Sequence, residues 1–424
     1  MIGGLGKMNR MLLAGVCAVA LLATGVTAAK AGDDEDLDLK VKWKGAPEFS
    51  NKDGSFKFKI RGRIMGDYDN VDQDTAITGE PDISGTELRR ARLGVEGVIM
   101  TNFKYKFEVD FAGDEVSTKD AYVAWANWAP VEKSEVRAGN QYVYSSLEQV
   151  TSSRFITFNE RAAFIDAFFL ERQIGVGVLL GDDHWSFQTG YYGAPPDEQG
   201  DFSDDTSAFT VRGTVAPINT DTTVLHAGAS YRHRDAGTSR DTGTAELFQY
   251  RARPDNHLAD RFIETPNFAS GDDMFVLEGA AVFKSLSVQG EYAQLEADDA
   301  LAGFNPTYNG YYIDASWFIT GEMRNYEADS GEFGRTKVLN PVTDGGWGAW
   351  QIAGRYDVLD LSDGSGAIPG CTECGEQKTW LIGLNWLTTD YTALKLQVAQ
   401  AEIDGGANDG AEITSVGLRA QIDW

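Results

Sequence analysis

The sequence predicts an all-β fold: a transmembrane antiparallel β-barrel of 16 strands whose third outer loop folds inward. Three observations predict it. Apolar and polar residues alternate over many segments after residue 55, and short and long connections alternate between those segments. In addition, no run after residue 31 approaches the ~18 apolar residues of a spanning helix. Any membrane span of the mature chain is therefore expected to be β.

The first 31 residues read as a secretory signal peptide (1–31). Lys7 and Arg10 precede the apolar run 11–26, and small residues follow at 28–31. A membrane anchor is the alternative, but the run is short and ends in small residues. We therefore expect an exported chain with a periplasmic N-terminal segment at 32–55 and the barrel at 56–424.

The stretch 103–111 shows the alternation most clearly. Its odd positions are apolar or aromatic, and its even positions are Lys104, Lys106, Glu108 and Asp110. A strand with one apolar and one charged face separates lipid from water. Segments of this kind begin near residues 56, 87, 103, 119, 134, 172, 185, 207, 222, 274, 286, 309, 347, 378, 392 and 412.

The connections between these segments alternate in length, which is typical of outer-membrane barrels. The long ones are mostly rich in Asp, Gly and Ser and lie at 69–85, 142–170, 193–206, 233–273, 297–307, 359–377 and 404–411. The connection 321–346 is long where a short turn is expected, and 321–328 is a candidate for another strand. A soluble sandwich or β-helix is the alternative fold, but aromatic residues stand near many segment ends, as in interfacial girdles.

Charge excludes one class of function and points to another. The 424 residues include 64 acids and 37 bases, a net charge of −27, which argues against a nucleic-acid-binding protein. Most acids lie in the predicted connections, whereas the predicted inward face carries more bases than acids, among them Arg61, Arg63, Arg90 and Arg92. Confined bases raise the local concentration of anions. The alternative is that each base pairs with an inward acid and only holds the wall.

The connection 142–170 is too apolar for a solvent-exposed loop. Folded into the barrel, it would bury its aromatic residues and leave Arg154 and Arg161 to line a constriction. The hydroxyls of Ser152, Ser153 and Thr157 would add donors for an oxyanion. Packing of this loop at a subunit interface is the alternative.

Signals for cofactors and catalysis are weak. Cys371 and Cys374, the only cysteines after residue 31, are expected to form a structural disulfide in an exported loop. The four histidines lack metal-ligand spacing, and no catalytic motif is present. We expect no cofactor, with Ca²⁺ or Mg²⁺ at the acidic outer loops as a candidate. A barrel hydrolase, a non-selective porin and a structural or adhesive barrel remain alternatives.

Several stretches resemble the phosphate-selective porin O and P family of Gram-negative outer membranes. They are ELRRARLG at 87–94, YKFEVDFAG at 105–113, DAYV at 120–123, LEQVTSSRFITFNER at 147–161, EFGR at 332–335 and LRAQIDW at 418–424. The resemblance spans the mature chain. One departure is Trp424, which stands where the family usually ends in Phe.

The resemblance implies a trimeric porin in the outer membrane, in contact with lipid and lipopolysaccharide, that passes small inorganic anions such as phosphate or polyphosphate by diffusion. It also implies an anion path lined by Arg89, Arg90, Arg154 and Arg161, with Asp120 as a partner acid. Because Arg89 and Arg90 are adjacent, strict alternation cannot send both inward. We expect Arg89 at the loop end of its strand.

Overall fold

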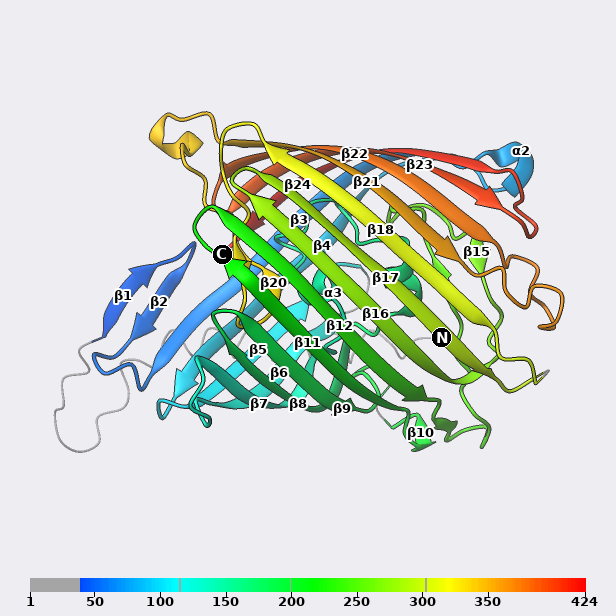
Figure 1. The fold of residues 1–424 in the computed structure, drawn as a ribbon, viewed down its shortest axis with the longest axis horizontal. Helices are drawn as coiled ribbons and strands as arrows, with labels where there is room; N and C mark the ends of the chain where they lie inside the picture. The colour runs from blue at the N-terminus through cyan, green and yellow to red at the C-terminus, as the bar shows by residue number, and fades with distance from the viewer. Residues whose placement is uncertain (1–38, 114–115, 199, 302) are drawn as a thin grey trace, which may run out of the picture. The chain divides into compact units, whose positions relative to one another are not determined.

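Sixteen long strands form a closed antiparallel wall in the computed structural model, which describes residues 39–113, 116–198, 200–301 and 303–424 (Figure 1). They are β3 (Lys57–Asp72), β4 (Ile83–Ile99), β5 (Phe103–Asp110), β6 (Ser117–Ala126), β7 (Lys133–Tyr142), β8 (Arg172–Asp182), β9 (Trp185–Tyr192), β11 (Ser207–Asn219), β12 (Thr223–Asp235), β16 (Ala269–Phe283), β17 (Leu286–Asp299), β18 (Thr307–Phe318), β21 (Ala349–Asp360), β22 (Glu376–Thr389), β23 (Thr392–Asp404) and β24 (Glu412–Asp423). Closure comes from β24, which pairs with β3. The predicted barrel of 16 strands is confirmed.

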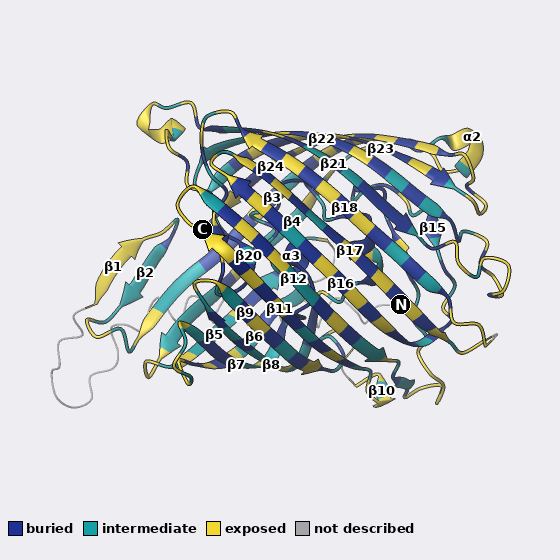
Figure 2. Ribbon diagram, viewed as in Figure 1, coloured by how far each residue is buried: buried dark blue, intermediate teal, exposed yellow. Residues whose placement is uncertain are grey.

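Polar residues line the inside of this wall and apolar residues cover the outside, the reverse of a soluble protein. Figure 2 shows the resulting stripes of buried and exposed residues along the strands. Among the largest fully buried side chains are four arginines: Arg212, Arg232, Arg355 and Arg419. Outward-facing Trp380 is 65% exposed. This inversion is the pattern of a barrel with lipid outside and a polar lumen.

The two ends of the barrel differ in their connections. At the short-turn end, β4 joins β5, β8 joins β9 and β22 joins β23 through tight turns. At the long-loop end lie α2 (Thr75–Thr78), β10 (Phe202–Asp204), β13 (Thr238–Ser239), β14 (Arg251–Ala252) and β15 (Ile263–Glu264). None of the helices among the described residues has the length and apolar character to cross a membrane.

Two structures extend from the short-turn end. The hairpin of β1 (Lys40–Trp43) and β2 (Pro47–Ser50) continues the sheet beyond β3, because β2 pairs with Lys57–Lys59 of β3. The predicted signal peptide at 1–31 lies outside the described residues, and the periplasmic location of 32–55 stays a prediction.

The second is the long connection 319–348 between β18 and β21. It contains β19 (Tyr326–Glu327), β20 (Glu332–Phe333) and the short helix η2 (Val342–Asp344). Because β19 and β20 pair only with each other, 321–328 holds no strand of the wall. The candidate extra strand is therefore wrong.

A disulfide joins Cys371 and Cys374, as predicted, with 5.3 Å between the Cα atoms. It lies in the 361–375 connection at the long-loop end. The two cysteines belong to the buried cluster that includes Phe262 and Ile263 of the neighbouring 236–268 connection. The disulfide therefore lies where two long loops pack together.

Candidate functional site in the barrel lumen

The connection between β7 and β8, residues 143–171, crosses the lumen to the opposite wall, and we call it the inward loop. The backbone N–H of Glu148 donates to the Glu291 carboxylate on β17 at 2.7 Å. The N–H of Asn159 donates to the side-chain oxygen of Gln397 on β23 at 2.9 Å. Hydrogen bonds to strands so far from its own hold the loop across the interior.

Apolar side chains of the inward loop are buried where the barrel interior is itself aromatic. Phe164 stacks on Tyr312 of β18, with ring centroids 6.1 Å apart, and Phe168 contacts Tyr250 edge-on at 6.1 Å. The loop also forms two short helices, α3 (Leu147–Val150) and α4 (Ala163–Phe168). Burial of this apolar surface explains why an apolar connection is stable inside a polar barrel.

The two arginines predicted on this loop have different surroundings. The Nε of Arg161 donates to the carbonyl of Glu148 at 2.9 Å, and its Nη2 donates to the carbonyl of Thr151 at 2.8 Å. Arg161 therefore bonds the loop to itself. Arg154 lies over the ring of Phe155, 5.1 Å from its centroid, and its Nε donates to Ser152 at 3.2 Å.

Arg89 and Arg90 both contact the lumen, so the expectation that Arg89 sits at a strand's loop end is wrong. The pairing of β3 with β4 shifts between Met65 and Gly66: Met65 pairs with Arg90 and Gly66 with Leu88. Arg89 therefore has no partner residue on β3. Such a β-bulge puts two consecutive side chains on one side of the sheet. Both guanidiniums approach one carboxylate of the inward loop, Glu160, at 2.8 Å from Arg89 and 3.8 Å from Arg90.

Arg61, Arg63 and Arg92 form a row around one fully buried carboxylate, Glu108 on β5. Its oxygens lie 3.1 Å from Arg61, 3.3 Å from Arg63 and 3.5 Å from Arg92. Arg63 also donates to Ser153 of the inward loop at 2.7 Å. These predicted site residues therefore share one buried carboxylate.

Asp120 on β6 is held by two bases. The Nε of Arg172 donates to it at 2.9 Å, and the Nζ of Lys106 lies 2.7 Å from its other oxygen. Asp120 thus pairs with Arg172 and Lys106 and with none of the four arginines of the predicted anion path, and its role in that path stays a prediction. The partner base Arg172, which opens β8 and stacks on Tyr142 at 3.8 Å, was not predicted.

The connection 319–348 also enters the lumen, a feature that the sequence did not predict. The carbonyl of Gly331 accepts a hydrogen bond from Arg212 of β11 at 2.7 Å, and Gln188 of β9 donates to the carbonyl of Ser330 at 2.7 Å. The N–H of Phe333 donates to Thr151 of the inward loop at 3.2 Å. Two segments thus narrow the interior together. The sequence signals for this connection were its length where a short turn is expected and the EFGR stretch at 332–335.

A cavity of about 320 Å³ lies between these two segments and the wall, and we call it the lower cavity. Seven basic side chains line it: Arg61, Arg63, Lys106, Lys133, Arg137, Arg154 and Arg172. Three acidic ones do so: Asp120, Glu327 and Glu332. Lys133 and Arg172 were missed because they stand at the first positions of their strands, where alternation is weakest as a guide.

A second cavity, of about 110 Å³, lies at the other face of the inward loop. Arg89, Arg90 and Arg161 line it together with Arg253 and residues 255–257 of the 236–268 connection. Eight of the ten predicted site residues border one of the two cavities, and Arg92 and Ser153 border neither. Arg89, Arg90 and Arg161 border this upper cavity, and Arg61, Arg63, Arg154, Ser152 and Asp120 border the lower one.

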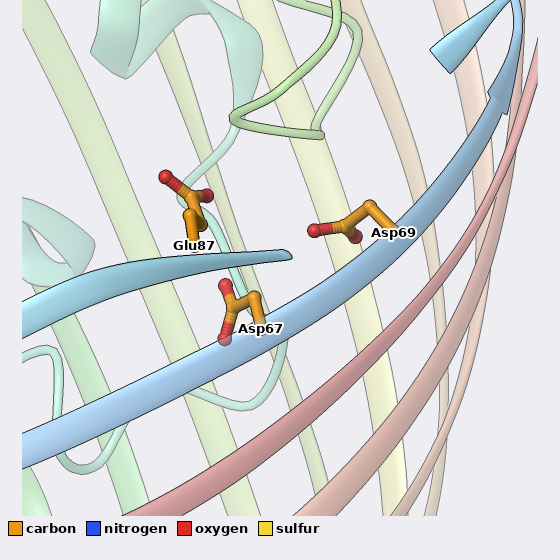
Figure 3. Close-up of side chains that lie close together, drawn as sticks. All are labelled: Asp67, Asp69 and Glu87. Atoms are coloured by element: carbon orange, nitrogen blue, oxygen red, sulfur yellow. The ribbon is translucent and has the colours of Figure 1, made fainter. Parts of the chain in front are cut away.

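Asp67, Asp69 and Glu87 bring carboxylate oxygens within 4.8 Å of one another near the upper cavity (Figure 3). Oxygens are suitable ligands for Ca²⁺ or Mg²⁺. However, Asp67 accepts from Arg419 at 2.8 Å, and the other two carboxylates bond Asn256 and His257 of the 236–268 connection, both at 2.8 Å. These bonds explain the cluster as the anchor of that connection.

Comparisons with known proteins agree with this architecture. The chain is 31% identical over 402 residues to an uncharacterized protein of Caulobacter vibrioides, covering 91% of this chain and 77% of the relative. It is 26% identical over 442 residues to Porin O of Pseudomonas aeruginosa, covering 96% and 97% of the two chains.

Solved porins share the fold at low sequence identity. An anion-selective porin from Comamonas acidovorans superposes with a TM-score of 0.55 at 12% identity, covering 87% of this chain and all of that one. The outer membrane channel DcaP of Acinetobacter baumannii gives 0.54 at 11% identity, covering 89% and 99%. OmpT of Vibrio cholerae, in its trimer form, gives 0.53 at 11% identity, covering 87% and 100%.

The family model of the phosphate-selective porins O and P matches residues 58–424, which is the entire barrel. The chain belongs to the phosphate-selective porin O and P family, and it is an outer-membrane porin of sixteen strands.

Proposed function

We propose that this porin passes small inorganic anions, including phosphate or polyphosphate, by diffusion through the lower and upper cavities. The observation that carries the proposal is the excess of basic over acidic side chains in the lining of the lower cavity. Seven bases and three acids line it, although the mature chain is strongly acidic.

Some of the acids that pair with these bases do not line the cavity. Glu108, which pairs with Arg61 and Arg63, is 0% exposed and does not line the cavity. Glu135 is likewise buried and pairs with Arg137 at 2.8 Å. An ion in the cavity is therefore nearer to the cations than to their partners, and nearer charges dominate the Coulomb energy.

Comparison proteins support the same reading. The Comamonas acidovorans neighbour is described as anion-selective, and OmpT of Vibrio cholerae is described as a trimer. We infer that this porin is a homotrimer embedded in outer-membrane lipid and lipopolysaccharide. Divalent cations at the acidic outer loops stay a prediction.

The hydrolase alternative gains no support from the described histidines. His226 and His257 bond Tyr326 and Glu87, respectively, His184 bonds the carbonyl of Ala216, and His233 bonds Asp273. None of these four histidines lines the lower cavity. A channel is the function that the geometry supports best.

The test is the reversal potential of the purified porin in planar bilayers under a KCl gradient. We expect a reversal potential with the sign of an anion-preferring channel. Addition of phosphate should reduce the chloride current. Arg154→Gln should lower the anion preference, whereas Arg251→Gln, the same charge change on half-exposed β14, should leave it unchanged. A cation-preferring wild type would refute the proposal.

A further inference from the structure

The lower cavity combines its bases with aromatic rings. Tyr122 and Tyr142 of the wall, Tyr144 beyond β7, Phe155 of the inward loop and Phe333 of β20 all line it. A bare tetrahedral oxyanion needs hydrogen-bond donors and positive charge only. Rings offer carbon surface, which contributes little to binding phosphate itself.

The size of the cavity also exceeds what one inorganic anion requires. Its volume of about 320 Å³ falls at the lower end of the ~300–1,000 Å³ typical of sites for organic ligands. Such sites are lined by apolar and aromatic side chains with a few convergent polar groups.

Guanidinium groups and rings are interleaved here. Arg137 lies 5.2 Å above the ring of Tyr122, and Phe155 has Arg154 and Arg335 each at 5.1 Å from its centroid. Planar guanidiniums and rings are the two surfaces on which an aromatic ligand stacks. The same guanidiniums offer donors to an oxyanion at the edge of that ligand.

Resting on the proposed anion-porin function, we propose that the lower cavity is a binding site for aromatic oxyanions, compounds with a planar ring and a phosphate or carboxylate group. The ring stacks among Tyr122, Phe155 and the adjacent guanidiniums, while the charged group accepts hydrogen bonds from Arg154 and the other bases of the cavity. Inorganic phosphate uses only the groups that donate hydrogen bonds to the charged end of the ligand.

The experiment measures block of the chloride current through the full-length porin by methyl phosphate and phenyl phosphate, which carry the same charged group. We expect half-block by phenyl phosphate at an about tenfold lower concentration, because stacking on rings adds to the binding. Equal block by the two compounds would overturn the aromatic class while leaving anion preference intact. A wild type without anion preference in its reversal potential would instead overturn the underlying function.

Variants separate the two halves of the site. Phe155→Leu should shrink the advantage of phenyl phosphate over methyl phosphate to about threefold or less, since the stacking surface is lost. Phe209→Leu, on the lipid-facing side of β11, should preserve the full advantage. Arg154→Gln should weaken block by both compounds; a loss confined to phenyl phosphate would contradict the role of the Arg154 guanidinium as a donor to the charged group.

Discussion

Arg89 and Glu160 form a two-point ion pair across the lumen, in which Nε and Nη2 of the arginine each donate to a different carboxylate oxygen at 2.8 Å. The strand residue and the inward loop are thereby tied together. Glu160 also lies 3.0 Å from Arg419, so one carboxylate offsets several cations beside the upper cavity. Its removal should expose their charge to passing ions.

Glu160→Gln is therefore expected to raise the anion-to-cation permeability ratio by up to about fivefold, because one unit charge at ~4 Å is worth ~1 kcal/mol even in water. Reversal potentials under a KCl gradient measure the ratio. Glu264→Gln is the matched control, because Glu264 pairs at 3.9 Å with Arg251 in a long loop. A ratio that stays the same or falls in Glu160→Gln would contradict the role assigned to this carboxylate.

Arg161→Ala should affect the shape of the pore more than its selectivity. The substitution removes hydrogen bonds to the carbonyls of Glu148 and Thr151, at a cost of roughly 1–3 kcal/mol. We expect a lower unfolding temperature and noisier single-channel current, because the inward loop loses its own internal support. Arg154→Ala serves as the comparison and should change selectivity with steady current. A change of selectivity with steady current in Arg161→Ala, instead of in Arg154→Ala, would show that Arg161 acts directly on ions.

Shortening the 319–348 connection should widen the pore. We expect replacement of residues 321–346 by Asn-Gly, a favoured two-residue turn, to raise single-channel conductance severalfold and to weaken anion preference. The reason is that Phe333 and Ser330 no longer fill the lumen beside the inward loop. Unchanged conductance would show that the narrowest part of the pore is not formed by the 319–348 connection. Insertion into the outer membrane, checked by resistance of the folded barrel to protease, is the control.

Alternation predicted the wall well because each strand must meet lipid on one face and water on the other. The stretch Phe103–Asp110, charged at every second position, became β5 as expected. The inward loop was predictable for a related reason, since its aromatic residues need burial wherever they go.

Other features depended on contacts between distant residues, which a local pattern does not contain. The bulge at Arg89 breaks alternation within a strand, and its stability comes from Glu160, 71 positions later. The entry of residues 330–331 into the lumen depends on Arg212, which donates to the carbonyls of both residues. Arg212 precedes them by 118 and 119 positions in the sequence. The carboxylate of Glu108, which Arg61, Arg63 and Arg92 share, likewise became visible only with the register of the strands.

Anion preference should depend on pH through Glu332 of β20, which lines the lower cavity. Burial raises the pKa of Glu332 to about 7, aided by the nearby Glu327 and opposed by Lys133. Below that pH the carboxyl is neutral and the bases of the cavity are less offset. Above it the carboxylate adds one negative charge, so anion preference should fall as pH rises from about 6 to about 8. Reversal potentials across this range test the step, and Glu332→Gln should remove it while holding the low-pH selectivity at every pH. A step that persists in Glu332→Gln would assign the titration to another group.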